Sequence, residues 1–310
     1  MDDRASQTIL PSARWANRLA QFFACLMLVA IPLHRFGGLT TPVALNVFAV
    51  ALGGALLALL LSLYALIRIW VKGDGGAFRA SFAALVALSM LAVPVTYYVL
   101  HMRLPMISDV STDTASPPRF GAAAAAKRGP GANPVAYPGA VAAQRQQAAY
   151  PDLRTFIIDR SVEEAYDLVE ETVRRLRWKP VVAEPPSLRP AKAGIIELSE
   201  QTMIVGFWDD VVIRVEGSNT RARVDIRSAS RYGAFDFGQN AARIRRFLVE
   251  LQTRVDAAGP GGVRRLRTTR SGAMVKKGKQ GDPSPASPQS ERDRAQPNAP
   301  RAREQKAPPR

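Results

Sequence analysis

The stretch VALNVFAVALGGALLALLLSLYALI, residues 43–67, carries no charged side chain along its whole length. A helix that crosses the hydrocarbon core of a bilayer needs about 20 consecutive apolar residues. The central run extends to about 43–71, and further apolar runs lie on either side of it, at about 15–34 and 80–101. We therefore predict a membrane anchor with three transmembrane helices within residues 1–104.

The first apolar run allows a second interpretation, the hydrophobic core of a signal peptide. The residues that follow it, Pro32-Leu33-His34-Arg35-Phe36, contain no pair of small side chains that would mark a cleavage site. We therefore favour an uncleaved helix. Small residues recur three or four positions apart in the second and third runs, which favours close helix packing in lipid. These residues are Ala51, Ala55, Ala58, Ala80, Ala84 and Ala87.

Positive charges flanking the runs predict the orientation of the anchor, because they favour the cytoplasmic side. Six basic residues flank the N-terminal side of the first run and the second connection: Arg4, Arg14, Arg18, Arg68, Lys72 and Arg79. Only Arg35 and Arg103 occupy the opposite side. We therefore expect a cytoplasmic N-terminus and, after three spans, an extracytoplasmic C-terminal domain.

The net charge of +16 is distributed unevenly along the 310 residues. Residues 259–310 hold 13 Lys/Arg and 4 Asp/Glu, whereas residues 150–255 hold 17 Lys/Arg and 16 Asp/Glu. The predicted folded domain therefore lacks the basic field that nucleic-acid binding requires, and we expect no nucleic-acid partner. Residues 259–310 are rich in Pro, Gly, Ser and charge, and we predict a basic disordered tail that contacts anionic lipid or polymer electrostatically.

Residues 150–258 show the periodicities of an α+β domain. Short strands are expected at 155–158, 179–183, 194–198 and 203–207, and a hairpin at 209–216 and 221–230. Ser161 and Glu164 have capping-box spacing ahead of a helical pattern, and a second helix is expected from Asp236. The order β-α-β-β-β-β-α predicts an antiparallel sheet with two helices packed on one face. Residues 105–149 are expected to form an extended segment and a mostly irregular Ala/Gly/Pro-rich connector, with at most a short helix at 122–126.

The hairpin pattern separates an apolar face from a charged face. With the turn at 217–220, Glu216 is expected opposite Arg221. Val211, Ile213 and Val215 would then share the apolar face. Asp210 would meet Arg227 on the other face, and Arg214 would lie opposite Arg223 with Asp225 diagonal to it.

Four motifs resemble a known family. They are Ile107-Ser-Asp-Val-Ser-Thr-Asp-Thr-x-x-Pro-Pro-x-Phe120, Tyr150-Pro-Asp-Leu153, Gly206-Phe-x-Asp-Asp-Val211 and the run from Arg227 to Ile244. Over roughly residues 105–255 the chain resembles the bacterial family named domain of unknown function 1499. Because the family is bacterial and the chain has predicted spans, we expect a protein of the bacterial inner (plasma) membrane, in the cell envelope. The resemblance supplies no catalytic residues. One departure is Ile195, where the family pattern leads us to expect Arg.

The chemistry available to the domain is limited. The two histidines, His34 and His101, flank predicted spans, and the single cysteine, Cys25, lies in the first apolar run. A Ser-His-Asp triad, a cysteine nucleophile and a histidine zinc site are therefore excluded within residues 105–258. We predict no catalytic residue, no metal site and no cofactor. Asp109 and Asp113 either bind a cation or tie the extended segment to the domain, and we prefer the second reading.

Two interpretations of the charged face stay open. It is either a cross-strand ladder of ion pairs or a site for a small anion or polar ligand, completed at the N-terminus of the last helix. The candidate ligand-binding residues are Asp210, Arg214, Asp225, Arg227, Arg231 and Asn240. The favoured function is a non-catalytic binding or scaffold domain, with membrane lipids, anionic envelope polymers or another envelope protein as partners. The alternative is an envelope enzyme that acts on a lipid or anionic substrate with Asp and Arg residues.

Overall fold

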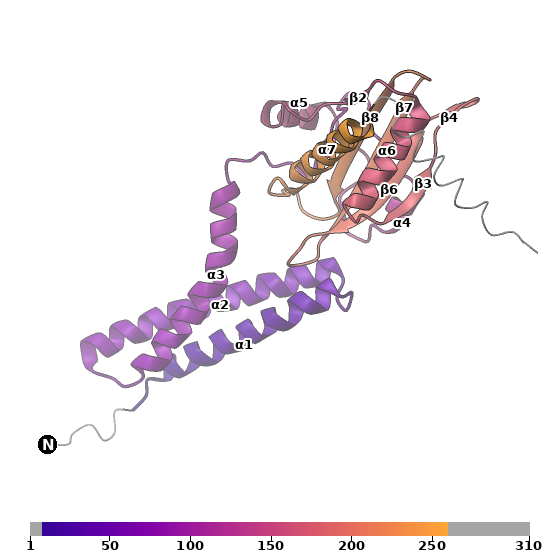
Figure 1. The fold of residues 1–310 in the computed structure, drawn as a ribbon. Coiled ribbons are helices and arrows are strands. Elements are labelled where there is room, and N and C mark those ends of the chain that lie inside the picture. Colours follow the sequence, from indigo (N-terminus) through magenta and orange to yellow (C-terminus); the bar gives the residue numbers. More distant parts are fainter. Residues whose placement is uncertain (1–7, 260–310) are drawn as a thin grey trace, which may run out of the picture. The chain divides into compact units, whose positions relative to one another are not determined.

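A computed structural model describes residues 8–259, and the predicted basic tail lies outside this range from residue 260 onward. Three long helices come first: α1 (Pro11–Arg35), α2 (Thr41–Lys72) and α3 (Ala77–His101) (Figure 1). Each is long and apolar enough to cross a membrane by length and composition. The predicted transmembrane helices are therefore present as helices.

Small residues form the contacts among the three helices, as their spacing predicts. Ala51, Ala55 and Ala58 of α2 are fully buried, and so are Ala80 and Ala87 of α3. Gly54 is in direct contact with the ring of Phe23, so a side chain at this position would displace the ring. Close approach of this kind supplies the van der Waals contact that holds helices together in lipid.

The remaining described residues form an antiparallel sheet with helices. Its strands run in the order β1-β8-β7-β6-β3, and β2 pairs with the rest of β8. The bounds are β1 Asp109–Ser111, β2 Phe156–Ile158, β3 Pro180–Glu184, β6 Gly194–Gln201, β7 Trp208–Gly217 and β8 Ala222–Ser230. A small separate hairpin, β4 (Ser187–Leu188) and β5 (Ala191–Lys192), follows the Pro185-Pro186 break. The predicted α+β class is confirmed.

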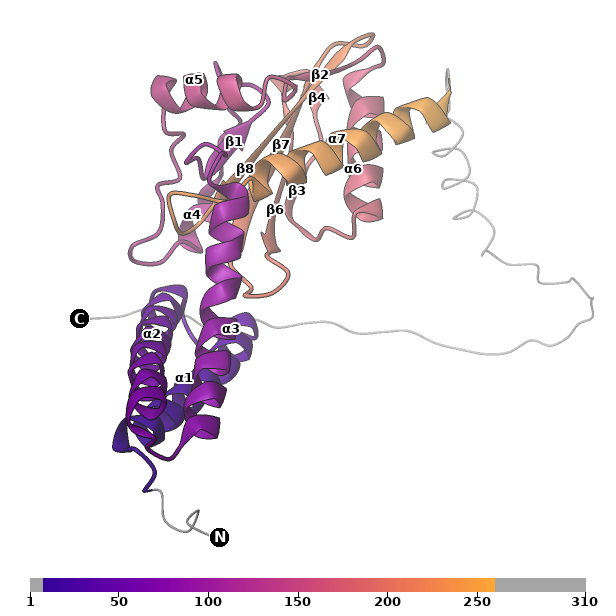
Figure 2. The same cartoon turned by 90° about the vertical axis from the view of Figure 1, so that its left-hand side faces the viewer.

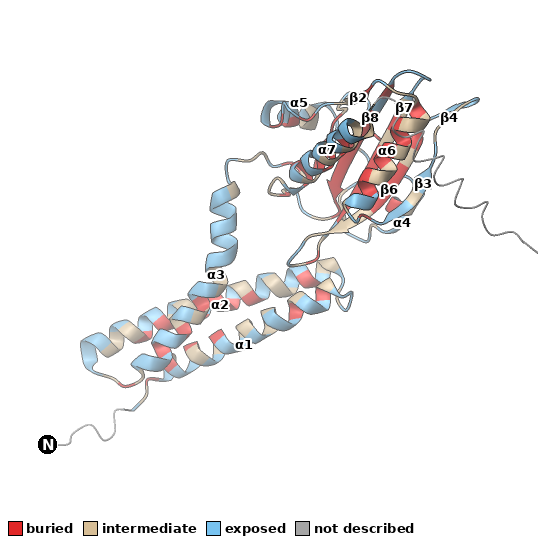
Figure 3. Cartoon of the chain, viewed as in Figure 1, coloured by how far each residue is buried: buried red, intermediate tan, exposed pale blue. Residues whose placement is uncertain are grey.

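Helices α6 (Val162–Arg175) and α7 (Gln239–Ala258) cover one face of this sheet (Figure 2). Ser161 caps α6 as predicted, because its Oγ accepts a hydrogen bond from the Glu164 N–H at 3.2 Å. The core lies between the two helices and the sheet, where Figure 3 shows the buried residues. Trp178 and Phe247 stack there with ring centroids 5.9 Å apart. Alternate residues of β7 and β8 point into this core, as their apolar periodicity predicts.

The predicted hairpin register is wrong by two residues. Glu216 lies opposite Arg223, and Arg214 lies opposite Asp225 rather than Arg223. A shift of two residues leaves every side chain on its predicted face, so the apolar pattern does not distinguish the two registers. The turn decides between them. Gly217 pairs with Ala222, and its backbone approaches the Arg221 carbonyl so closely that only glycine fits.

Two other expectations are corrected. Residues 203–207 form the loop between β6 and β7 instead of a strand, because β6 itself continues to Gln201. The connector is also more regular than expected. Besides the predicted short helix, α4 (Ala122–Ala126), it contains β1 and a second helix, α5 (Ala140–Ala149). Helix α5 has no apolar stripe, so its periodicity gave no signal.

Candidate functional site

The face of the sheet opposite α6 and α7 carries the charged residues. Strands alternate their side chains, so Asp210, Arg214, Asp225 and Arg227 all point to this face. Residues 109–137, which we call the covering arm, lie over part of it. The covering arm packs on β7 and β8 through apolar side chains. Its residues Phe120, Ala124 and the half-buried Val135 contact Val212 and Ala229. The charged face is therefore partly enclosed.

Arg227 is the best-buried large side chain of this face, at 2% relative exposure. Its Nε and Nη2 donate to the two carboxylate oxygens of Asp109, at 2.9 and 2.6 Å. Nη1 donates to the Pro118 carbonyl at 3.1 Å, and Nη2 also to the Val135 carbonyl at 2.9 Å. The Phe120 ring lies 4.6 Å from the guanidinium carbon. All partners belong to the covering arm, so Arg227 holds the arm instead of facing Asp210 as predicted.

A second cluster surrounds Asp210. Arg231 donates to this carboxylate from Nη2 at 2.7 Å, and Arg128 of the covering arm donates from Nε at 3.1 Å. Ser199 also donates to it, at 2.9 Å. The expected partner of Asp210 was Arg227, but the shifted register places Ala229 opposite Asp210. Asp209, the neighbour of Asp210 on β7, points to the helix side of the sheet, because successive strand residues alternate between faces. Its carboxylate accepts a hydrogen bond from Arg243 of α7 at 2.6 Å.

A third cluster surrounds Asp225. Arg214 donates to this carboxylate at 3.1 Å, and Thr155 and Thr112 donate at 2.6 and 3.1 Å. Arg214 also donates to Asp113 at 3.0 Å. The Asp113 carboxylate accepts two backbone N–H groups of its own turn as well. The preferred reading of Asp109 and Asp113 therefore agrees with the structure, since both fasten the covering arm to β8 or β7.

Asn240, the last candidate, lies apart from the other five, on the helix side of the sheet. Its Oδ1 accepts from Ser228 at 2.6 Å, and its Nδ2 donates to Ser230 and to the Ser108 carbonyl. Asp236 accepts from the Asn240 N–H at 2.8 Å and so occupies the N-terminus of α7. The six predicted residues thus form separate pairs and clusters on two faces, and most of their polar atoms are already bonded.

Glu197 of β6 points to the charged face and was not predicted. Its Oε1 accepts from the Gly121 N–H at 2.6 Å, while Oε2 has no hydrogen-bond partner among the described residues. The residue is 6% exposed. Burial therefore raises the pKa of this carboxyl, and the Gly121 hydrogen bond opposes the shift. A single glutamate in a strand gives no sequence pattern from which its burial or its raised pKa could have been predicted.

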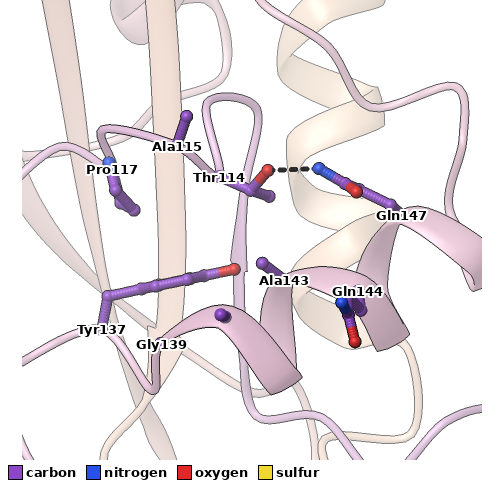
Figure 4. A pocket seen from close by; sticks show the side chains of 9 residues that line it. Thr114, Ala115, Pro117, Tyr137, Gly139, Ala143, Gln144 and Gln147 are labelled. Atoms are coloured by element: carbon purple, nitrogen blue, oxygen red, sulfur yellow. Dashed lines mark hydrogen bonds between the residues drawn. The ribbon is translucent and has the colours of Figure 1, made fainter.

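A groove of about 450 Å³ lies between the turn at 114–117 and α5 (Figure 4). We call it the α5 groove. None of its nine lining residues is charged: Thr114, Ala115, Pro117, Tyr137, Gly139, Ala140, Ala143, Gln144 and Gln147. Gln147 donates to Thr114 across it at 2.7 Å. Sequence analysis missed the groove because α5 itself was not predicted.

Tyr137 connects the α5 groove to the Arg227 pair. Its ring centroid lies 5.4 Å from the guanidinium carbon of Arg227, within cation–π range. Burial raises the pKa of its hydroxyl to about 12, so this group is a neutral donor near pH 7. Gln146, behind the groove, is fully buried and bonds the backbone of Ser111 through both side-chain atoms. The groove wall is therefore fixed to β1 rather than loosely attached.

Comparison with known proteins agrees with the motifs. Residues 109–251 match the model of the family described as Protein of unknown function (DUF1499). The resemblance is therefore confirmed over the part of the chain from β1 to α7. No curated protein and no solved structure matches the chain. The function must accordingly be argued from the site, since fold alone does not imply function.

We predict that Glu197→Gln stabilises the domain at neutral pH, and that the gain shrinks in acid. The folded pKa of Glu197 lies above its ordinary value of 4.5, so the folded state binds the proton more tightly. The free energy of unfolding of the wild type therefore falls as the pH rises from about 4.5 through the folded pKa. Glutamine carries no charge at any pH, so the variant does not lose this free energy. Urea unfolding of residues 105–258 at pH 4 and pH 7 measures this. The fragment holds every residue of both core clusters of the domain.

Glu163→Gln, in the first turn of α6, is the matched control. It should give no gain at pH 7, because a carboxylate in the first turn of a helix is stabilised by the helix N-terminus. Equal stability of Glu197→Gln and wild type at both pH values would contradict the prediction, because it would mean that the Glu197 carboxylate is solvated.

Proposed function

We propose that the chain is an integral membrane protein that presents a non-catalytic binding domain outside the cytoplasm, in the envelope of a bacterium. Three helices of membrane-spanning length support insertion. The excess of basic residues before α1 and between α2 and α3 supports the orientation. The covering arm and the sheet would then face the envelope space, attached to the inner membrane through α3.

The paired state of Asp210 and Asp225 favours binding over catalysis by these two residues. A general base needs a free lone pair within reach of a substrate proton. Both oxygens of Asp210 accept from arginines, and Asp225 accepts from Arg214 and Thr155. An envelope enzyme that uses these Asp and Arg residues would first have to break such pairs, so it is the weaker candidate.

The observation that carries the proposal is the α5 groove. It is open, it has a volume of about 450 Å³, and its lining is apolar and amide-bearing without charge. Pockets that are mostly apolar with a few oriented polar groups are typical ligand sites. We infer that the groove receives an uncharged segment of an envelope polymer or protein, with Gln144 and Gln147 as hydrogen-bonding groups.

Orientation is tested with alkaline phosphatase, which is active only outside the cytoplasm. A fusion after Ala258 should be active, whereas a control fusion after Lys72, in the second connection, should be inactive. The reason is the charge asymmetry of the connections. An inactive Ala258 fusion beside an active cytoplasmic reporter at the same position would reverse the assignment.

The groove is tested by placing the photo-crosslinking residue p-benzoylphenylalanine at Gln144 in cells. We expect a covalent adduct of raised mass, since Gln144 lines the groove. The same residue at Val141, which is exposed on α5 but does not line the groove, should give none.

Ala143→Trp should abolish the adduct, because the indole fills the groove while Gln144 stays in place. Equal adducts from positions 141 and 144, or an adduct that survives Ala143→Trp, would show that the groove is not the ligand site.

A further inference from the structure

One end of the sheet is held close to the point where the chain leaves α3. The Ser108 carbonyl accepts from the Ser230 N–H at 2.8 Å, and Asp109 lies opposite Ala229 at the end of β8. On the other side of β8, Ala229 pairs with Asp210, near the start of β7. Adjacent strands are about 4.8 Å apart, so the incoming chain and the start of β7 lie about 10 Å apart at the same end.

The link between α3 and this end is short. Helix α3 ends at His101 and β1 begins at Asp109, which leaves residues 102–108 between them. The eight Cα–Cα steps from His101 to Asp109 reach at most about 29 Å when fully extended. If α3 spans a bilayer, this end of the sheet therefore stays within that distance of the membrane surface.

The loop between β6 and β7, residues 202–207, projects from the same end. It is closed by a hydrogen bond from the Thr202 N–H to the Phe207 carbonyl at 2.8 Å and by one from the Phe207 N–H to Thr202 Oγ1 at 2.9 Å. Its tip carries Met203 and Ile204, which are 85% and 72% exposed. No other large apolar side chain in residues 102–259 is as exposed.

The surroundings of the tip are apolar and aromatic. Residues 202–208 contain no charge, and Trp208, at the start of β7, is 39% exposed. The loop that leaves β8 at the same end carries Phe235 and Phe237, whose ring centroids lie 4.2 Å apart. Of these rings, Trp208 is of the type that is enriched where proteins meet the membrane–water interface.

We propose that the 202–207 loop inserts Met203 and Ile204 into the interface of the bilayer that holds α1–α3. The occupant is lipid because the short link keeps this end of the sheet within reach of the membrane surface and the loop tip is apolar and uncharged. An exposed tip of two large apolar side chains in water is costly, and burial among acyl chains removes that cost. The proposal goes beyond the binding function and holds on either side of the membrane.

The test uses the full chain with Cys25→Ser, so that a single new cysteine can be labelled. An environment-sensitive fluorophore is attached at Ile204→Cys, or at Met203→Cys as a second position on the same tip. Val249→Cys is the matched control, because Val249 is 67% exposed on α7 and apolar but lies ten residues into a helix that starts at this end. The proteins are reconstituted into phosphatidylcholine vesicles that contain a nitroxide-labelled lipid.

The nitroxide lipid should quench the label at positions 203 and 204 several-fold more than the label at 249, and aqueous iodide should show the reverse order. Equal quenching at 204 and 249 by both agents would overturn the proposal. A label at 204 that is shielded from iodide but not quenched by lipid would also overturn it, since a protein surface would then cover the loop.

Discussion

The ion pair between Asp109 and Arg227 is the constraint on which the domain depends. Two hydrogen bonds of 2.9 and 2.6 Å join the first strand after the membrane helices to a central strand of the sheet. Arg227 is almost fully buried, and a buried guanidinium without partners is strongly unfavourable. The covering arm must therefore lie on the charged face, because its carboxylate and carbonyls satisfy this cation. The α5 groove follows from this arrangement, since Tyr137 is both part of its wall and a neighbour of Arg227.

The two faces of the sheet have different roles. The inner face packs Val211, Ile213 and Ile226 against α6 and α7, which supplies the apolar burial that stabilises the domain. The outer face holds charges that are buried only because the covering arm pairs them. The ion pairs of such a face add little net stability, since desolvation offsets most of the electrostatic gain. The same pairs hold the arm in one position, and the groove keeps a defined shape.

The sequence predicts those features that depend on local periodicity. Uncharged apolar runs indicate α1–α3, alternation gives the faces of β7 and β8, and the spacing of Ser161 and Glu164 marks the start of α6. Features that depend on distant pairing were not predictable. Asp109 and Arg227 are 118 positions apart, and the local sequence around either residue does not indicate that the two form a pair. The hairpin register failed for a related reason, because alternation has a period of two and the turn geometry decides between registers two residues apart. Helix α5 lacks an apolar stripe, and its attachment through the buried Gln146 is visible only in three dimensions.

A double-mutant cycle on Asp109 and Arg227 tests the central claim most directly. Urea unfolding of residues 105–258 is measured for Asp109→Asn, Arg227→Met, the double variant and wild type. Either single change should lower the free energy of unfolding by about 3–5 kcal/mol, because it leaves the other group buried without its partner. The double variant should cost clearly less than the sum of the two, with a coupling energy above about 1 kcal/mol. Additive losses, or single losses below about 1 kcal/mol, would contradict the account, because a pair on which the arm depends cannot be weakly coupled.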